Sequence, residues 1–303
     1  MNPAHEIEGG DGSAVITARD LVKTYGATRA LDRVSLRIGP GRIVGLIGPN
    51  GAGKTTALKS ILGLVPYEGE LRVLGLNPYT ERARLMQEVC FIADVAVMPR
   101  WLKVSDAIDF VAGVHPRFNR KRAEDFLART EIHRNSRVKQ LSKGMVTQLH
   151  LALVMAIDAR LLVLDEPTLG LDILYRKRFY DTLLNEYFVN EESTEQPRTI
   201  IVTTHQVEEI EHILTDVIFI AHGRIVLDLA TEKLADHFTQ LAVSGDRLAE
   251  ARALKPIHEH ESIGRHLLYF EDVDRKRLAA LGEVRTPGLA DLFVAKLSRE
   301  AMA

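Results

Sequence analysis

Residues 43–56, IVGLIGPNGAGKTT, join an uncharged apolar run to a glycine-rich segment that ends in a lysine and two threonines. The run at 43–47 is typical of a buried parallel strand, and residues 57–62 are typical of a helix. The glycines therefore lie where a strand turns into a helix N-terminus, and backbone N–H groups at such a turn bind phosphate. We expect this turn to organise the rest of the chain.

The segment Gly48-x4-Gly53-Lys54-Thr55 has the P-loop spacing. Lys54 is expected to reach the β and γ phosphates of a nucleoside triphosphate, and Thr55 to hold Mg²⁺. The alternative is a glycine-rich turn with a solvated lysine, which does not explain why all the fixed positions agree with both flanking elements. The predicted nucleotide-binding residues of the loop are Gly48, Asn50, Gly51, Gly53, Lys54, Thr55 and Thr56.

Composition sets limits on the class of protein. The 303 residues are 46% hydrophobic and 26% charged, which suits one large domain and a small one. The net charge of −2 gives no general attraction to nucleic acid, and a single cysteine, Cys90, excludes an internal disulfide and fits a reducing compartment. Residues 1–13 lack a signal-peptide pattern and are expected to form a disordered lead. No apolar stretch approaches the ~20 residues that span a bilayer, so a role at a membrane would need a partner protein.

The order of strand and helix patterns predicts an α/β fold around the P-loop strand. Alternating apolar residues before the loop predict antiparallel strands beside the nucleotide core. Between about residues 95 and 157 the apolar residues follow helical spacing only, which indicates a helical insertion. We place the nucleotide-binding domain at 14–230 and a small α/β accessory domain at 231–303.

A second set of chemical groups follows two further strands. The aliphatic run 161–164 ends in Asp165 and Glu166, where ligands of open α/β sheets gather. Asp165 is expected to hold Mg²⁺ and Glu166 to polarise the attacking water, because phosphoryl transfer needs mainly positioning and charge stabilisation. Acid pairs at strand ends are common, and the upstream P-loop is what favours catalysis. His205 follows the strand at 199–204 and could donate to a γ phosphate; a helix cap or a solvated side chain is the alternative.

The order of these motifs, with the segment LSKGM at 141–145 between them, resembles the ATP-binding subunit of an ABC transporter over residues 14–230 or so. The resemblance identifies 48–55 as Walker A, 161–165 as Walker B, 168–172 as the D-loop and LSKGM as the signature. It implies that His205 is the switch histidine and that Tyr25 stacks on adenine. It also implies that Ser142 and Gly144 contact the γ phosphate held by a second, head-to-tail subunit, and a predicted helix N-terminus there favours an anion.

Two positions depart from the family pattern. Lys143 and Met145 replace the usual glycine and glutamine of the signature, and Lys143 adds positive charge near the expected γ phosphate. Asp94 stands where the family normally has a glutamine after the strand at 89–92. A carboxylate still offers Mg²⁺ a hard oxygen, although it cannot donate a hydrogen bond. The alternative for Asp94 is a turn residue at the end of the strand.

The resemblance implies an ATPase that powers a separately encoded membrane permease of exporter type, in the cytoplasm and held at the inner face of the cell membrane through that permease. ATP and Mg²⁺ are the expected cofactors. The expected partners are the permease and a second ATPase subunit, in an ATP-dependent homodimer or heterodimer, with no nucleic acid. One alternative is an importer's ATPase. Another is a soluble ABC protein acting on ribosomes or DNA, which the single P-loop and the lack of sustained heptads disfavour.

Two smaller features admit more than one interpretation. Trp101, beside Arg100, lies in the stretch 94–104 that the family uses to bind the permease, and it either docks there or packs in the core. His258 and His260 lie two residues apart with His266 nearby, but no full ligand set accompanies them, so solvated or paired side chains are favoured over a metal site.

Overall fold

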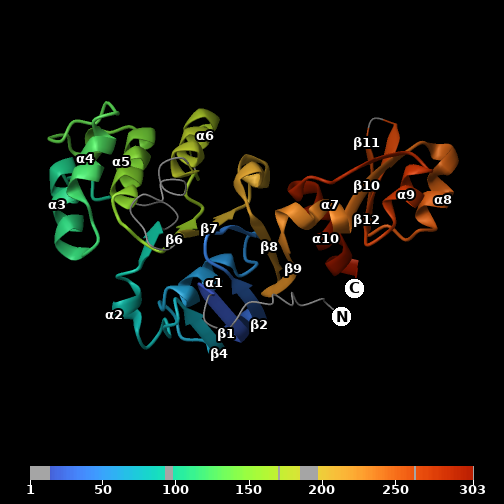
Figure 1. Ribbon diagram of the computed structural model, residues 1–303, viewed down its shortest axis with the longest axis horizontal. Helices are drawn as coiled ribbons and strands as arrows, with labels where there is room; N and C mark the ends of the chain where they lie inside the picture. Colours follow the sequence, from blue (N-terminus) through green and yellow to red (C-terminus); the bar gives the residue numbers. More distant parts are fainter. Residues whose placement is uncertain (1–13, 93–97, 170, 185–196, 263, 303) are drawn as a thin grey trace.

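The computed structural model describes residues 14–92, 98–169, 171–184, 197–262 and 264–302. The predicted disordered lead at 1–13 and the predicted metal ligand Asp94 lie outside these residues. Figure 1 shows three parts along the longest axis: a helical part at one end, the strands around α1 in the middle, and a second α/β part at the other end.

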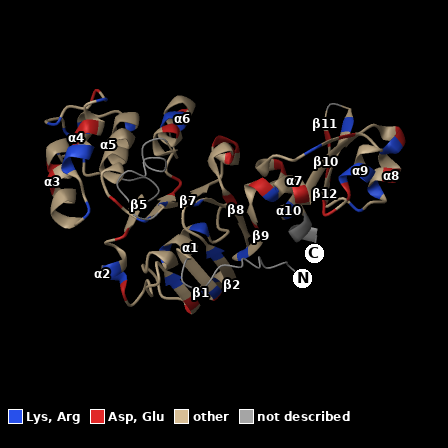
Figure 2. Cartoon of the chain, in the orientation of Figure 1, with Lys and Arg blue, Asp and Glu red and all other residues tan. Residues whose placement is uncertain are grey.

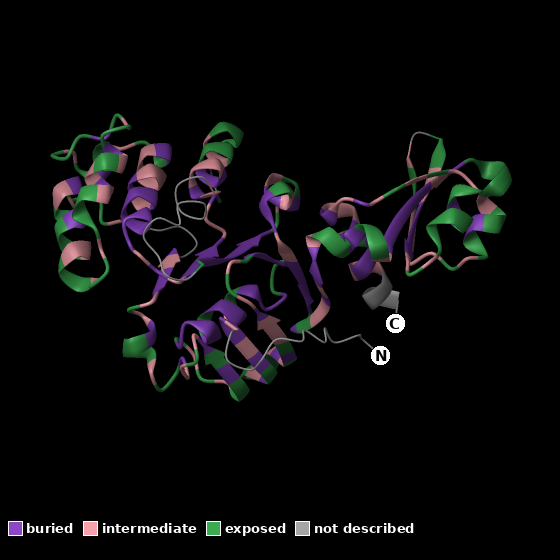
Figure 3. Cartoon of the chain, viewed as in Figure 1, coloured by how far each residue is buried: buried purple, intermediate pink, exposed green. Residues whose placement is uncertain are grey.

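Within the described residues, a central sheet has six strands in the order β5-β6-β7-β3-β8-β9. All are parallel except β9, which forms a hairpin with β8 that turns at Gly223. The interiors of β3, β6 and β7 are buried throughout, which explains why their sequences are continuous aliphatic runs instead of alternating ones (Figure 3). The strand bounds are β3 (Ile43–Ile47), β5 (Val89–Ile92), β6 (Leu161–Asp165), β7 (Thr199–Thr204), β8 (Asp216–Ala221) and β9 (Arg224–Ala230).

A second sheet, in the order β2-β1-β4, is antiparallel in the part of the chain that the structure describes, as the alternating residues predict. Its strands are β1 (Ile16–Tyr25), β2 (Thr28–Ile38) and β4 (Glu68–Val73). The P-loop helix α1 (Lys54–Ile61) packs between the two sheets, because Leu58 and Ile61 share a buried cluster with Val34 of β2 and Leu46 of β3. A short helix, α2 (Arg82–Leu85), ends before the chain turns into β5.

The helical insertion contains α3 (Val104–Val114), α4 (Arg120–Leu127), a 3₁₀ turn (Val138–Gln140) and α5 (Lys143–Met155). Asn119 and Ser142 cap α4 and α5 by accepting hydrogen bonds from backbone N–H groups of the first turn. Helix α5 connects the insertion to the sheet: Leu149 packs with α3, while Leu151 packs in the cluster that includes Leu164 of β6. Helix α6 (Ile173–Thr182) follows β6.

Trp101 lies just before α3 with 67% of its surface exposed, so the interpretation that it packs in the core is wrong. Two apolar side chains of α3, Phe110 and Val114, are exposed to a similar extent, 67% and 63%. Helix α3 therefore buries one apolar face, with Val104 and Ile108, and leaves a second apolar face in solvent.

The C-terminal part has the element order β-α-β-β-α-β, with its four described strands arranged β11-β12-β10-β13. Helices α8 and α9 cover one face of this sheet, where Leu241, Leu268, Phe270 and Leu278 form the core. The bounds are α7 (Leu234–His237), β10 (Phe238–Val243), α8 (Leu248–Arg252), β11 (His258–Ser262), β12 (Arg265–Glu271), α9 (Arg275–Ala279), β13 (Glu283–Arg285) and α10 (Leu289–Met302).

The last helix, α10, packs against the nucleotide core as well as against its own sheet. Leu289 and Leu292 are fully buried in the cluster that contains Val217 and Phe219 of β8, and the ring of Phe293 contacts that of Phe219 edge-on at 5.1 Å. The rings of His258 and His260 lie against Tyr269, and no described group of three or more His, Cys, Asp or Glu side chains could hold a metal ion by itself.

Candidate nucleotide-binding site

The predicted motifs meet at one edge of the central sheet. Strands β6, β7 and β3 are neighbours and parallel, so their carboxyl ends lie side by side. Asp165 is the last residue of β6, His205 follows β7, and the P-loop follows β3. The carboxyl edge of an open α/β sheet is where such folds bind ligands.

Two glycines of the P-loop are required by close approaches of the backbone. A Cβ atom on Gly48 would lie 2.4 Å from the carbonyl oxygen of Ile220, and one on Gly53 would lie 2.5 Å from that of Ala30. Gly53 also has φ +111°, a conformation that side chains with a Cβ rarely adopt. Because Gly53 is the N-cap of α1, this geometry directs the first N–H groups of the helix toward the loop.

Lys54 is held inside the loop. Its Nζ donates to the carbonyl oxygens of Gly48 at 2.7 Å and Pro49 at 3.3 Å, and it lies 3.9 Å from Oε1 of Glu166. The side chain is only 7% exposed. Burial lowers the pKa of Lys54, whereas the carboxylates of Glu166 and Asp165 act in the opposite direction. The loop therefore holds a desolvated ammonium group next to the two acids.

The other P-loop residues offer polar groups at the surface. Asn50, Gly51 and Thr55 are exposed, and Thr56 is half-buried at the start of α1. Tyr25, at the end of β1, is 46% exposed, and Nζ of Lys23 lies 4.9 Å from the centre of its ring. An exposed aromatic ring with a nearby cation is compatible with stacking on a base.

Thr203, which was not identified from the sequence, positions both Asp165 and Glu166 at the end of β6. Its Oγ1 donates to Oδ1 of Asp165 at 2.6 Å and accepts from the backbone N–H of Glu166 at 3.0 Å. Glu166 has φ +47°, an uncommon conformation for a residue with a Cβ, and its N–H is also within 3.2 Å of the Thr203 carbonyl oxygen. The signal in the sequence was two threonines at the end of an aliphatic strand, where buried hydroxyls need partners.

His205 and Glu166 are in direct contact. Nδ1 of His205 lies 2.9 Å from Oε2 of Glu166, while the other oxygen of the same carboxylate faces Lys54. The alternatives of a helix cap and a purely solvated histidine are therefore not what the structure shows. Lys54, Glu166 and His205 form one connected chain of polar groups at the sheet edge.

The predicted signature lies at the start of α5. Oγ of Ser142 accepts from the N–H of Met145 at 3.2 Å, and Lys143 is exposed. Gly144 is buried under the ring of Tyr175 from α6, and a Cβ at this position would lie 2.9 Å from Cε1 of that ring. Tyr175 is a residue that sequence reasoning missed, because no local pattern shows which side chain covers a glycine of another helix.

The predicted D-loop leads into α6. Oδ1 of Asp172 caps the helix by accepting from the N–H of Tyr175 at 3.0 Å. Arg176 donates to the carbonyl oxygen of Leu171 at 2.7 Å, to Glu209 at 2.6 Å and to Gln206. This arginine was also missed, and it ties the D-loop to the segment immediately after His205.

Comparisons with known proteins identify the family of the chain. The family model of the ABC transporter matches residues 31–169. The chain is 30% identical to the Nod factor export ATP-binding protein I of Rhizobium etli, over 93% of this chain and 92% of that protein. It is 32% identical to the probable multidrug ABC transporter ATP-binding protein YbhF of Escherichia coli, over 69% of this chain and 36% of that protein.

A solved structure of the ATP-binding subunit of an ABC transporter superposes with a TM-score of 0.63 at 24% identity, covering 73% of this chain and 91% of that one. That likeness shows the fold. None of the described helices has the length and apolarity needed to cross a bilayer. The chain therefore belongs to the ABC transporter family, in which it is an ATP-binding subunit that hydrolyses ATP.

Proposed function

We propose that this chain binds ATP with Mg²⁺ and hydrolyses it to drive an exporter whose membrane permease is a separate polypeptide. The observation that carries the proposal is the connected group of Lys54, Glu166 and His205 at the carboxyl edge of the central sheet. Export is supported by the names of its relatives, a Nod factor export protein and a probable multidrug transporter protein.

The P-loop would bind the phosphates of ATP. Lys54 would leave the carbonyl oxygens of Gly48 and Pro49 and move to the β and γ phosphates, because a phosphate is the stronger acceptor for an ammonium group. Gly48, Asn50, Gly51 and Gly53 would supply backbone N–H groups, with Thr56 at the start of the helix. Tyr25 would stack on adenine.

Glu166 would orient the attacking water and accept its proton. The hydrogen bond with His205 and the N–H bonds to Thr203 hold the carboxylate in place, and Lys54 offsets its charge. Once a γ phosphate is present, His205 would donate to it. Most of the catalytic work here is positioning, as phosphoryl transfer requires.

The oxygen donors of the site fit Mg²⁺. The buried Asp165 carboxylate and the Thr55 hydroxyl are hard ligands. Mg²⁺ is usually held by one or two carboxylates together with phosphates. Bound Mg²⁺ would neutralise charge that develops on the phosphate oxygens. The role of Asp94 in this shell stays a prediction.

Ser142 and Gly144 would complete the ATP site of a second subunit. The N-terminus of α5 offers N–H groups and a partial positive charge, and the exposed Lys143 adds a cation. The assembly would be an ATP-dependent homodimer, or a heterodimer with another ATPase subunit. The permease would hold it at the inner face of the cell membrane.

The test of this function is a pair of substitutions. Glu166→Gln should keep ATP binding and reduce turnover by ~10²-fold or more, since one well-placed catalytic group is lost. Lys54→Ala should weaken both ATP binding and ATP turnover. Glu208→Gln removes the same charge as Glu166→Gln from an exposed residue of the neighbouring segment, and it should change neither ATP binding nor turnover. Turnover at the wild-type rate in Glu166→Gln would contradict the proposed role.

A further inference from the structure

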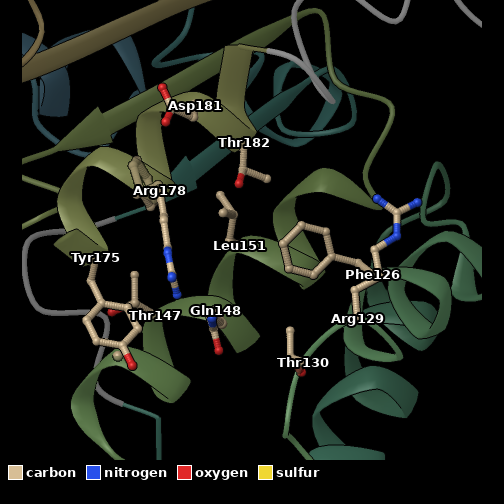
Figure 4. A pocket seen from close by; sticks show the side chains of 12 residues that line it. Phe126, Arg129, Thr130, Thr147, Gln148, Leu151, Tyr175, Arg178, Asp181 and Thr182 are labelled. Atoms are coloured by element: carbon tan, nitrogen blue, oxygen red, sulfur yellow. The ribbon is translucent and has the colours of Figure 1, made fainter.

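A pocket of about 320 Å³ lies between α4 and α5 of the helical insertion and α6 of the core. Figure 4 shows the side chains that line it, which come from all three helices. None of the motifs discussed above requires a cavity here. Its volume is at the lower end of the range for small-molecule sites and equals roughly ten water molecules.

The lining combines apolar and polar side chains. Phe126, Leu151 and Phe179 form the apolar part, and these side chains are buried or half-buried. Thr130 and Gln148 add a hydroxyl and an amide. A ligand that fills the pocket would therefore have an apolar body with a polar end.

Two arginines line the pocket: Arg129 lies beside Phe126, and the exposed Arg178 comes from α6. Figure 4 shows Arg178 extending from α6 toward α5, into the space beside Gln148. Among the described residues Arg178 makes no hydrogen bond or ion pair, in contrast to Arg176 one half-turn earlier, which has three acceptors. Asp181 also lines the pocket, but its carboxylate points away from the guanidinium group.

We propose that this pocket binds a small carboxylate with an apolar body, about ten non-hydrogen atoms in size. Arg178 would pair with the carboxylate, because a guanidinium group presents donors that match both of its oxygens. The apolar body would lie on Phe126 and Leu151. An anion is favoured over a cation because the lining carries two arginines, Arg129 and Arg178, and one acid, Asp181.

Occupancy of the pocket would act on the signature. Gly144 and Tyr175 belong to the lining, and the Tyr175 ring is the surface on which Gly144 packs. A ligand between α5 and α6 would hold these helices at the spacing seen here, so that the signature moves less freely toward a partner's ATP. This consequence rests on the proposed function, whereas binding of the carboxylate does not.

The binding experiment uses octanoate as the probe and the full chain without nucleotide. Saturable binding is expected by calorimetry or NMR titration, with a dissociation constant on the order of 1 mM. Arg178→Gln should weaken octanoate binding by ~10-fold or more. Lys177→Gln removes the same charge from the next residue of α6, which does not line the pocket, and should bind like the wild type.

Octan-1-ol and octylamine test the apolar contacts and the charge pairing separately. Octan-1-ol should bind the wild type and Arg178→Gln equally, because it lacks the charge that Arg178 pairs with. Equal binding of octanoate to the wild type and Arg178→Gln, no saturable binding at all, or octylamine binding as well as octanoate would overturn the site.

The second readout is ATP turnover. Saturating octanoate should lower turnover of the wild type and Lys177→Gln by several-fold and leave Arg178→Gln unchanged. Equal turnover of the wild type with and without octanoate would overturn the link to the signature. A chain that binds octanoate but never hydrolyses ATP would instead refute the proposed function and leave the site standing.

Discussion

One hydroxyl group of Thr203 contacts both Asp165 and Glu166, so we expect Thr203→Val to displace both acids. The valine leaves a buried oxygen of Asp165 without its donor and removes one acceptor of the Glu166 N–H. Such a loss destabilises a protein by about 1–3 kcal/mol. ATP turnover should fall more than ATP binding does, because the acids position water and metal and the P-loop holds most of the nucleotide.

Thr203→Ser is the matched variant, since it keeps the hydroxyl and loses only a methyl group. Urea unfolding and steady-state turnover of both variants check the expectation. If Thr203→Val hydrolyses ATP as fast as Thr203→Ser does, the hydroxyl has no positioning role.

Asp228 is expected to make stability depend on pH. Burial, together with the nearby Asp216, raises its pKa from 3.8 to about 6. In the unfolded chain the carboxyl group releases its proton at lower pH than in the fold. Its contribution to stability is therefore present below about pH 4 and is lost as the pH rises through 6. A pKa raised by about two units corresponds to a loss of about 3 kcal/mol of unfolding free energy, and the partial exposure of Asp228 reduces this loss to about 1–2 kcal/mol.

Asp228→Asn should remove the loss of stability that occurs as the pH rises through 6. The variant is expected to gain stability at pH 7.5 and much less at pH 4.5, measured by denaturant unfolding at both values. Glu232→Gln is the control, because Glu232 is exposed and loses the same charge nearby. An equal gain at both pH values would show that the change acts through packing and not through titration.

At the scale of single residues, the sequence predicted the groups that follow strand ends and missed those that reach across the fold. Lys54 was found by the P-loop spacing, and Asp165, Glu166 and His205 were found because they lie at or just after the end of a recognisable strand. Thr203, Tyr175 and Arg176 were missed because their partners lie on other elements. No spacing along the chain identifies such a partner.

At the scale of elements, strands were predicted more accurately than helix ends. The aliphatic runs of β3, β6 and β7 are bounded by glycine or polar residues, so their limits are visible in the sequence. Helix ends depend on capping contacts instead: Asn119 caps α4 by accepting from the N–H of Arg122, and apolar spacing does not show where such a contact starts a helix. The packing of α10 against Phe219 was not predicted, since periodicity shows an apolar face without showing what covers it.

The exposed apolar side of the helical insertion leads to a prediction for Trp101. Because its side chain is 67% exposed, Trp101→Ala should change the free energy of unfolding by no more than about 0.5 kcal/mol. Basal ATP turnover should also stay the same. As a docking residue, Trp101 should contribute about 2 kcal/mol to binding of the permease, which is roughly thirty-fold in affinity.

Tyr79→Ala is the matched control, since Tyr79 is an aromatic residue that is 52% exposed in the turn after β4. Co-purification with the co-expressed permease and permease-stimulated turnover measure the effect. Undiminished permease binding by Trp101→Ala would exclude this residue from the contact.

At the scale of the whole molecule, the described parts of the chain carry charges of both signs. Figure 2 shows acidic and basic residues interspersed along the helices at both ends of the long axis. The division at residue 230 is less sharp than the sequence suggests, because α10 returns from the C-terminal sheet to the nucleotide core. Separating the two parts of the chain would expose Leu289 and Leu292, so the accessory part is structurally tied to the ATPase part.

The proposed head-to-tail dimer gives the last prediction. One chain carries a P-loop on β3 and a signature on α5, so two copies could complete two composite sites. ATP should therefore shift the Glu166→Gln variant from monomer to dimer in sedimentation, because the variant does not hydrolyse the ATP that holds the dimer together. Adding Ser142→Arg should prevent the shift, since the new side chain places bulk where the partner's γ phosphate would lie. Ser244→Arg, with the same change at an exposed site just after β10, should leave the dimer intact. A monomer at every ATP concentration, with ATP bound and Glu166→Gln unable to hydrolyse it, would rule out the homodimer and point to a different ATPase subunit as the partner.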